Sequence, residues 1–325
     1  MSELARLVEP IRAWLASQAR ILDLDVDSVS IEPILNWGGF VNRSFRVSAG
    51  HRRLFLKLTS DSEMKRGLEV WRRVAPRIES RYHGPRMVGW LDLLSRSFSG
   101  PLFEWIDGGT PARLDHELAA GIRRAVSGLH DDIDLGRQLP GPVRSCAEAY
   151  LRSYHDRFSE DLATVAADPP PFVDDALIAW LEGRIRDLEA RARESPAFHA
   201  LADRPVHGDL WLDNVLVDRD GGWYLLDWDG LSLGDPVIDW TMLFGPSRDH
   251  PKAATEDIVL THAPLSRDER DRLAVYAEAS QLDWVLDPLA DWVQGGQEPE
   301  HGARVRLANE RIHAQALEAY RERYG

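Results

Sequence analysis

Cysteine and long apolar runs are scarce in this chain of 325 residues. Its one cysteine, Cys146, cannot form an internal disulfide, and it leaves no cysteine cluster for a zinc site. No apolar run approaches the roughly 20 residues that cross a bilayer, and the first residues lack the basic segment and apolar core of a secretory signal. These absences predict a soluble cytoplasmic protein with no membrane partner.

Positive charge is also scarce, since 39 lysines and arginines face 53 aspartates and glutamates, for a formal net charge of -14. A phosphate backbone requires a basic footprint, so this balance argues against nucleic acid as a partner. A negative field of this kind favours a cationic small molecule. With 44% hydrophobic residues, the chain can bury one large or two moderate cores, which predicts two lobes.

The first third of the chain predicts a small, mainly antiparallel sheet. Leu7, Ile11 and Leu15 recur at helical spacing and predict a leading amphipathic helix over residues 3–20. Short apolar runs between turn residues predict strands at 31–37, 44–47, 54–58, 85–91 and 101–106, with a helix at 62–80.

The rest of the chain is mainly helical by its periodicity. Apolar residues at helical spacing predict helices at 114–130, 143–165, 174–194, 266–294 and 303–323. The proline run Pro169-Pro170-Pro171 breaks this pattern and predicts a loop. A sheet followed in the sequence by a group of helices is typical of an α+β protein.

Between residues 209 and 227, polar residues stand at the ends of short apolar runs. Asp209 and Asn214 are five positions apart, and Asn214 opens the apolar run 215–217. A Gly-rich turn at 218–222 and a second apolar run predict a β-hairpin that returns Asp227 to the point where the hairpin began. Two carboxylates and one carboxamide brought together in this way predict a magnesium-nucleotide site.

The chain resembles the aminoglycoside phosphotransferase and choline kinase family in three ordered motifs, His207-Gly208-Asp209-Leu210 with Asn214-Val215-Leu216, then Leu226-Asp227-Trp228-Asp229, then Gly234-Asp235-Pro236 with Asp239. The spacing of the first motif is also that of the kinase catalytic loop, H-R-D-x-x-x-x-N. Gly208 stands in place of the kinase arginine, and Asp227-Trp228-Asp229 in place of Asp-Phe-Gly. The combination specifies the family and leaves the acceptor molecule open.

The resemblance implies a protein-kinase-like fold with a nucleotide-binding lobe at 1–106 and a helical catalytic and substrate-binding lobe at 107–325. In the family, the Asp of His-Gly-Asp is the catalytic base, and the Asn and the later Asp bind magnesium. These roles fall on Asp209, Asn214 and Asp227. We expect His207 only to orient the loop by hydrogen bonding.

The resemblance also implies nucleotide contacts in the first lobe. Glycines at Gly38 and Gly39 would let backbone amides approach phosphate oxygens, with Asn42 in the same turn. The segment that ends in the Gly108-Gly109 pair is expected to act as a hinge between the lobes. Its backbone at Glu104 and Ile106 would meet the adenine edge.

Lys57 lies within an apolar strand and needs a charged partner there. A kinase lysine at this place contacts the nucleotide phosphates and a glutamate of the next helix. Glu63 and Glu69 are candidates for that glutamate. We favour Glu69 because it would face inward with its neighbours Leu68 and Val70.

Acidic residues recur every four positions at Asp283, Asp287 and Asp291, with Trp284 and Trp292 beside them. Carboxylates and indole rings together suit a cationic acceptor. The alternative is that the acids form a solvated face and the tryptophans a packing face.

The predicted function is therefore transfer of a phosphoryl group from ATP, with Mg2+, to a hydroxyl of a small molecule, and an aminoglycoside-like or other cationic acceptor is favoured. One alternative is a metabolic kinase of the choline, sugar or homoserine type. A second is a metal-dependent hydrolase with His207, Asp209 and Asp227 as ligands, which leaves Lys57 unexplained. A third is a nucleotide-binding module without catalysis.

Overall fold

The computed structural model describes residues 3–34, 42–112, 114–244, 265–295 and 302–325. The chain divides into two compact units. Unit 1 comprises Met1–Pro111 and Asn214–Leu231, and unit 2 comprises Ala112–Asp213 and Ser232–Gly325. The expected division after residue 106 assigned the segment 214–231 to the second lobe, whereas it makes its contacts within unit 1.

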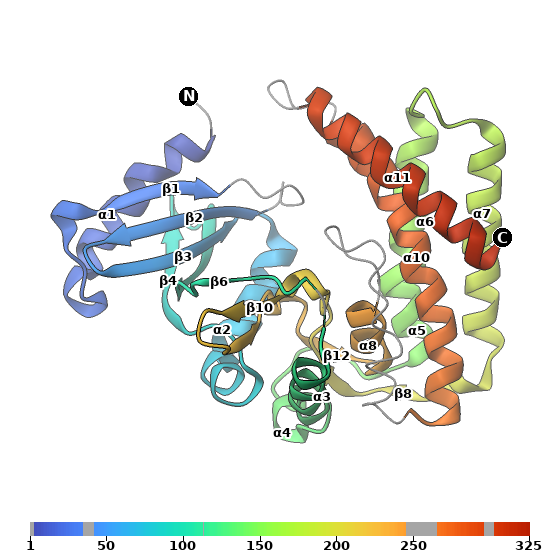
Figure 1. Ribbon diagram of the computed structural model, residues 1–325, viewed down its shortest axis with the longest axis horizontal. Coiled ribbons are helices and arrows are strands. Elements are labelled where there is room, and N and C mark those ends of the chain that lie inside the picture. The colour runs from blue at the N-terminus through green and yellow to red at the C-terminus, as the bar shows by residue number, and fades with distance from the viewer. Residues whose placement is uncertain (1–2, 35–41, 113, 245–264, 296–301) are drawn as a thin grey trace. The chain divides into compact units, whose positions relative to one another are not determined.

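Unit 1 is built on a five-stranded antiparallel sheet with the strand order β1-β2-β3-β5-β4 (Figure 1). The strands are β1 (Ser30–Ile34), β2 (Asn42–Ala49), β3 (Arg52–Thr59), β4 (Met87–Leu93) and β5 (Phe98–Glu104). Short strands in an antiparallel sheet confirm the predicted arrangement.

One face of this sheet carries the core of unit 1. Helix α1 (Glu3–Leu22) buries Leu7, Ile11 and Leu15 against β2, β3, β4 and β5. Leu54, Leu56 and Leu58 of β3 belong to the same cluster because alternate side chains of a strand share a face. The amphipathic pattern of α1 therefore serves packing.

Helix α2 (Ser62–Tyr82) packs on the other face, which Lys57 shares. Its Trp71 ring stacks on Phe103 of β5 at a centroid distance of 4.7 Å, and Phe103 stacks on Phe55 of β3 at 6.4 Å. Asp61 caps the helix by accepting hydrogen bonds from the backbone of Glu63 and Met64. Lys57 is thus a cation on an aromatic, helix-covered face.

A second, three-stranded sheet in unit 1 has the order β11-β10-β6. Its strands are β6 (Gly108–Gly109), β10 (Val215–Asp218) and β11 (Trp223–Leu225). A Cβ on Gly108 would lie 2.2 Å from the Val217 carbonyl oxygen, so this pairing requires glycine. Gly108 and Gly109 are therefore part of a strand, two residues before this part of unit 1 ends at Pro111, and their role as a hinge stays a prediction.

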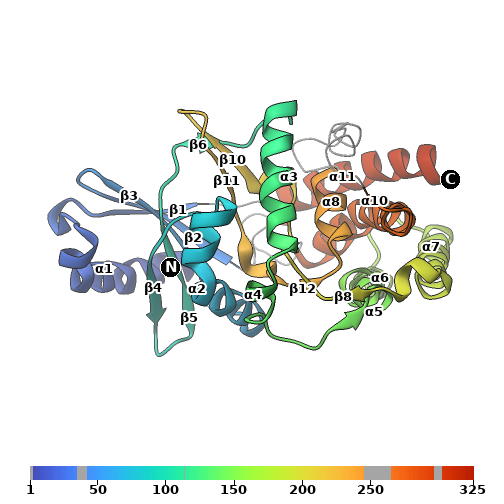
Figure 2. The same cartoon turned by 90° about the horizontal axis from the view of Figure 1, so that it is seen from below.

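Unit 2 is mainly helical. Its helices are α3 (His116–His130), α4 (Ile133–Gly136), α5 (Cys146–Tyr150), α6 (Asp156–Ala167), α7 (Asp175–Glu194), α8 (Val237–Phe244), α10 (Arg267–Gly295) and α11 (Gly302–Tyr324). Helix α10 packs against both α6 and α11, and α5, α6 and α7 are grouped together (Figure 2). A π-helical turn, Leu151–His155, joins α5 to α6. The predicted α+β arrangement, a sheet followed by helices, is confirmed.

Two pairs of short strands also lie in unit 2. Strand β7 (Arg144–Ser145) pairs with β8 (Leu201–Ala202), and β9 (Arg204–Val206) pairs with β12 (Ser232–Gly234). Strand β9 leads directly into His207, so this pairing anchors the start of the first motif.

The long helix α10 is fixed by a buried ion pair. Arg272 donates to both oxygens of Asp235, at 2.7 and 3.2 Å, and to the Ala197 carbonyl at 2.9 Å. Asp235 also accepts from the backbone of Val237 at the start of α8. One residue of the third motif therefore connects α8 and α10.

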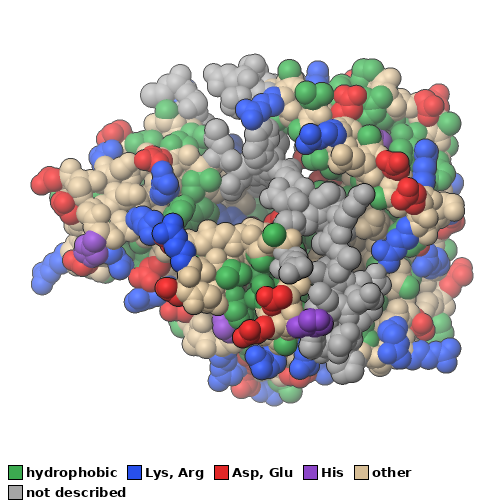
Figure 3. Space-filling model, in the orientation of Figure 1, with side chains coloured by type: hydrophobic (Ala, Val, Ile, Leu, Met, Phe, Trp, Pro, Cys, Tyr) green, Lys and Arg blue, Asp and Glu red, His purple; other side chains and the backbone are tan. Residues whose placement is uncertain are grey.

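On the face drawn in Figure 3, acidic and basic side chains are interspersed over the described parts of each unit. Among the described residues, no helix combines the length and apolarity that a membrane span requires.

Candidate active site

The hairpin β10–β11 brings Asn214 and Asp227 together in unit 1. Val215 pairs with Leu225, and the Leu226 backbone N–H donates to the Asn214 carbonyl at 2.8 Å. Asn214 and Asp227 therefore flank the open end of one hairpin, as its length predicted. A turn and two apolar runs are sufficient to bring these two residues together.

The hairpin is docked on the end of α2. The His83 ring stacks on Trp223 at a centroid distance of 3.8 Å, and the Leu225 N–H donates to the His83 carbonyl at 2.9 Å. Trp228 is fully buried, and its indole N–H donates to the Leu225 carbonyl at 2.7 Å. These contacts hold Asp227 at a defined place beside β3.

Lys57 is buried in unit 1 between two carboxylates. Its Nζ donates to Asp227 and, at 2.9 Å, to Asp229. Burial alone would lower the pKa of Lys57, but the two carboxylates raise it above its ordinary value. The lysine is therefore a fixed positive charge, as a group that binds phosphate oxygens must be.

The two carboxylates differ in their surroundings. Burial raises the pKa of Asp229 to about 7, and the adjacent Asp227 adds to the effect, while Lys57 opposes it. Asp227 is more exposed and has a positive φ of 63°, a left-handed conformation that aspartate adopts more readily than most residues. Close carboxylates of this kind attract a further cation.

The predicted partner of Lys57 on α2 is wrong. Glu69 is exposed on α2, whereas its neighbours Leu68 and Val70 are buried, so it does not face inward. The helix presents Gly67 to the turn η5 (Trp228–Gly230), where a Cβ would lie 2.3 Å from the Asp229 carbonyl oxygen. The close approach of this turn lets Asp229 supply the charge that we expected from Glu69.

The other expected nucleotide contacts of the first lobe remain predictions. Gly38 and Gly39 lie outside the described residues. Asn42 begins β2 opposite Thr59, and its buried Oδ1 has no hydrogen-bond partner among the described residues. The Glu104 N–H donates to the Arg86 carbonyl at 2.9 Å, which uses the amide of that residue, and Ile106 is half-buried just beyond β5.

The oxygens gathered in unit 1 suit a magnesium ion. Carboxylate and carboxamide oxygens are the hard ligands that this ion takes from proteins, usually with only one or two carboxylates. Asn214 and Asp227 provide them from one hairpin, and Asp229 lies two residues further on. Among the described residues, no three His, Cys, Asp or Glu side chains form a metal cluster, so the alternative metal site of His207, Asp209 and Asp227 gains no support.

Asp209 lies in unit 2 on a tightly shaped loop. Gly208 has a φ of 81°, a conformation that favours glycine and would strain the arginine found there in protein kinases. The Asp209 N–H donates to Nδ1 of the fully buried His207 at 3.3 Å. His207 thus orients the loop by hydrogen bonding, as expected, and Leu210 is buried behind it.

Asp239 anchors this loop from α8. Its carboxylate accepts from the backbone N–H groups of His207 and Gly208, both at 2.9 Å, and lies 2.9 Å from the His130 Nε2. Burial disfavours its charged form, but the hydrogen bonds from His130 and Gly208 hold the pKa of Asp239 below its ordinary value. A buried, ionised carboxylate therefore fixes the backbone directly before Asp209.

The predicted acidic residues converge in unit 2. We define the acidic cluster as Asp161 of α6 with Asp283, Asp287 and Asp291 of α10. Asp287 keeps solvent access, yet the surrounding protein and the carboxylates of Asp283 and Asp291 raise its pKa to about 7. Burial raises the pKa of Asp161 to about 6, and Arg157 opposes this shift.

The two tryptophans of α10 have different surroundings. Trp284 meets Trp211 of the first motif edge to face at 6.1 Å, so it lies beside the loop that carries Asp209. Trp292 has the Arg306 guanidinium over its ring at 4.4 Å and Phe172 at its edge. Trp284 therefore remains a candidate acceptor contact, whereas the ring of Trp292 is already packed.

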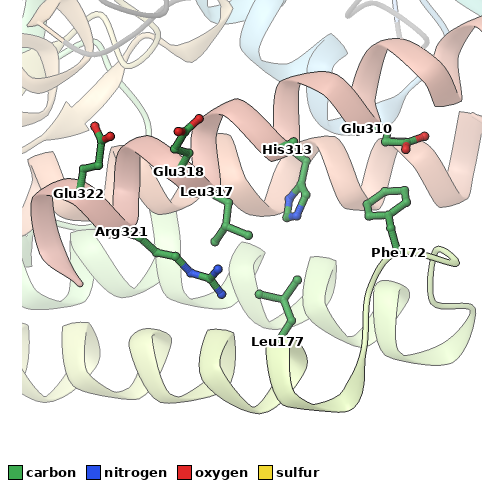
Figure 4. Close-up of a pocket in the computed structure, with 9 residues that line it drawn as sticks. Phe172, Leu177, Glu310, His313, Leu317, Glu318, Arg321 and Glu322 are labelled. Atoms are coloured by element: carbon green, nitrogen blue, oxygen red, sulfur yellow. The ribbon is translucent and has the colours of Figure 1, made fainter.

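A groove lies between α11 and the start of α7, and Phe172, which also meets Trp292, is part of its lining (Figure 4). Phe172 and Leu177 lie on one side of it, and His313 and Leu317 on the other. None of the predicted site residues lines this groove, and the His313 Nδ1 is engaged with the Val285 carbonyl at 2.9 Å. We therefore do not place the candidate site there.

Four residues that build these sites were not predicted from the sequence. Asp229 and Asp239 stand inside motifs that were recognised, but no role was assigned to them. Gly67 and Arg157 gave no usable signal, because a glycine in a helix and an arginine at helical spacing from Asp161 are ordinary features. Their partners, Asp229 and Asp283, are distant in the sequence.

Known proteins resemble this chain in family and in fold. The model of the phosphotransferase enzyme family matches residues 34–276. No curated protein matches the sequence.

Solved structures share the fold at low sequence identity. A spectinomycin phosphotransferase in complex with ADP and spectinomycin is 13% identical with a TM-score of 0.65, covering 94% of this chain and 97% of that one. A wild-type aminoglycoside 2'-phosphotransferase in complex with GDP is 14% identical with a TM-score of 0.62, covering 96% and 99%. Choline kinase from Cryptosporidium parvum is 15% identical with a TM-score of 0.58, covering 96% and 97%. The chain therefore belongs to the phosphotransferase enzyme family, and it is a small-molecule phosphotransferase with a kinase-like two-lobe fold.

Proposed function

We propose that the protein transfers the γ-phosphoryl group of ATP to a hydroxyl of a small molecule, with magnesium, and that the acceptor is cationic. The observation that carries this proposal is Lys57, a buried and permanently charged amine held by Asp227 beside Asn214. A cation and oxygen ligands within one unit are the parts that recur around nucleotide phosphates in kinases.

Unit 1 would bind the nucleotide. Lys57 would contact phosphate oxygens, while Asn214 and Asp227 would hold the magnesium ion, with Asp229 as the alternative partner of Lys57. Bound magnesium would neutralise charge on the phosphate oxygens. Asn42, with its unpartnered buried oxygen at the start of β2, is the described member of the turn proposed to lie near the phosphates.

Unit 2 would bind and activate the acceptor. Asp209 would accept the proton of the attacking hydroxyl while the oxygen of that hydroxyl bonds to the γ-phosphorus. The bond between the γ-phosphorus and the bridging oxygen breaks, and ADP leaves. His207 and Asp239 hold the backbone of this loop in place within unit 2. Positioning contributes most of the rate because the transition state is loose.

The acidic cluster favours a cationic acceptor over a neutral sugar. Asp283, Asp287 and Asp291 present carboxylates from one helix, and Trp284 adds an aromatic wall beside the Asp209 loop. Similar folds occur in phosphotransferases of aminoglycosides and spectinomycin and in choline kinases, so amino sugars and amino alcohols are the first acceptors to test.

The test is an ADP-release assay with ATP or GTP, with and without magnesium, against amino sugars, amino alcohols and neutral sugars. We expect turnover with ATP, magnesium and a cationic acceptor, and a fall in kcat of ~10³- to 10⁴-fold in Asp209→Asn. The exposed Asp203→Asn is the matched control and should keep wild-type turnover. Wild-type kcat in Asp209→Asn would contradict the assigned base.

A further inference from the structure

A positive charge occupies the acidic cluster in unit 2. The Arg157 Nη2 of α6 lies 2.6 Å from Oδ1 of Asp283. The Arg157 side chain is 42% exposed and that of Asp283 only 10%, so the arginine lies on the solvent side of the pair and covers the carboxylate. Rings of Tyr154 and Phe158 lie about the guanidinium at 6.0 and 5.8 Å.

A buried hydroxyl lies beneath this pair without a partner. Tyr154 is 1% exposed, and its hydroxyl has no hydrogen-bond partner among the described residues. It interacts electrostatically with Asp283, Arg157 and Asp209. The residue lies in the π-helical turn before α6, a feature that is frequent at functional sites. An unsatisfied donor here can bond to Asp283 when that carboxylate changes partner.

A second carboxylate is available to Arg157 on its own helix. Asp161 follows it by four residues, a spacing that places two helical side chains side by side. Oδ2 of Asp161 is buried without a hydrogen-bond partner among the described residues, and the Arg157 charge already acts on this group. Arg157 therefore has two alternative partners, Asp283 and Asp161.

We propose that Arg157 is a specificity-determining residue, a resident cation that an amino group of the acceptor replaces at Asp283 while the arginine turns to Asp161. This inference rests on the proposed function, because it concerns the acceptor of the same reaction. Tyr154 would then donate to the Asp283 carboxylate in its new pairing.

The exchange selects acceptors with two or more amino groups. Exchange of the cation at Asp283 yields little net binding, because the Arg157 charge already acts on Asp161. The turn to Asp161 therefore recovers only part of the ion pair lost at Asp283, and the new amine pair offsets the rest. Net attraction must come from the next acids along α10, Asp287 and Asp291. Residues four apart rise about 6 Å along a helix, so a second amino group at that distance from the first would reach Asp287. An acceptor with one cationic group cannot make both contacts.

Binding of two probes by calorimetry, without nucleotide and at pH 8, tests this inference. The probes are kanamycin, which carries several amino groups, and choline, which carries one cationic group. In Arg157→Gln we expect the affinity for choline to rise at least fivefold and that for kanamycin to rise less. Arg157→Lys, which keeps the charge, should resemble the wild type, and so should Arg152→Gln, which removes an exposed arginine of the π turn.

A second variant tests the alternative partner without altering Arg157. Asp161→Asn should weaken kanamycin binding several-fold, because the displaced arginine loses its second carboxylate. Thermal unfolding of each variant establishes that it is folded. Weaker or unchanged choline binding in a folded Arg157→Gln, unchanged kanamycin binding in Asp161→Asn, or no binding of either probe would overturn the inference.

The proposed function fails in a different experiment. If no hydroxyl acceptor supports ADP release from ATP, phosphoryl transfer is not the reaction, but the calorimetric comparison can still be read because it requires no turnover.

Discussion

Two cations paired with carboxylates, one in each unit, differ in how firmly they are held. Lys57 is buried between Asp227 and Asp229, on a strand in the middle of a sheet. Arg157 is half-exposed on a helix and lies over a single buried carboxylate, with another in reach. The first cation is held almost fully buried by two carboxylates, whereas the second is half-exposed and has a choice of partner.

The difference fits two different roles, binding of the phosphate groups and discrimination among acceptors. A charge that must meet the same phosphate oxygens in every turnover benefits from a rigid strand and two partners. A charge that discriminates among acceptors must be able to leave its carboxylate, which an exposed guanidinium on a long side chain can do. Substitutions at Lys57, Asp239 and Gly67, and kinetics over a range of pH, test that contrast.

Lys57→Met should abolish most of the activity. We expect ADP release to fall at least ~10²-fold, and the free energy of unfolding to fall by about 3 kcal/mol, because Asp227 and Asp229 lose their shared cation. Steady-state kinetics and urea unfolding measure the two effects. Lys65→Met, which removes a half-exposed lysine of α2, is the control and should change kcat less than twofold. Wild-type turnover in Lys57→Met would remove the basis for placing the nucleotide in unit 1.

Asp239→Ala should loosen the Asp209 loop in unit 2. The backbone N–H groups of His207 and Gly208 would lose their acceptor in a buried place, which costs about 1 to 3 kcal/mol for each group. We expect kcat to fall at least tenfold while the affinity for ATP changes little, as measured by kinetics and nucleotide titration. An unchanged kcat in a destabilised variant would restrict Asp239 to a structural role.

Gly67→Ala should disturb the rigid cation site through packing alone. The added Cβ meets the Asp229 carbonyl at 2.3 Å, so η5 must shift, and we expect a loss of about 1 to 3 kcal/mol in the free energy of unfolding. Gly183→Ala is the matched control, since α7 leaves open space there and alanine should stabilise the helix by about 0.5 to 1 kcal/mol. Equal effects of the two substitutions would contradict the close approach.

A change of pH should alter the KM of the acceptor more than the KM of the nucleotide. The groups facing Asp161 and Asp287 are Arg157, Glu160, Asp283 and Asp291. As pH rises from 5.5 to 7.5, Asp161 and Asp287 lose protons at pKa values of about 6 and 7, so the KM of a cationic acceptor should fall about fivefold. Steady-state kinetics across this range measure it, and a KM that rises with pH would contradict the role of the cluster.

The same groups affect stability with a definite sign. Their pKa values are raised on folding, so the folded protein holds protons that the unfolded chain releases between about pH 4 and 7. This contribution to stability is complete at low pH and is lost as pH rises through about 7. Acceptor binding therefore improves in the range where these groups cease to stabilise the fold.

Local patterns predicted most of the fold and the hairpin site. Alternation in β3, the Gly-rich turn after Asp218 and the spacing of Asp209 and Asn214 each depend on neighbours in the sequence. The prediction of Glu69 failed because periodicity states which residues share a helix face, but not which other element approaches that face. The glycine at Gly67 allows the turn that carries Asp229 to approach α2, and Asp229 is far away in the sequence.

The acidic cluster was predicted only in part for a similar reason. The repeat of acids in α10 was visible, but its relation to Arg157, Asp161 and Tyr154 depends on how α6 packs against α10. Those residues are more than a hundred positions from Asp283, and nothing local to either helix indicates the pairing.

The segment Asn214–Leu231 has a consequence for how the protein is made. It completes unit 1 although unit 2 precedes and follows it in the chain. Asp227 leaves the ribosome 170 residues after Lys57. Until then, the Lys57 amine on the nascent sheet lacks the carboxylates that neutralise it. Early synthesis therefore yields an incomplete unit, and a fragment that stops at residue 111 would lack both acids that neutralise its lysine.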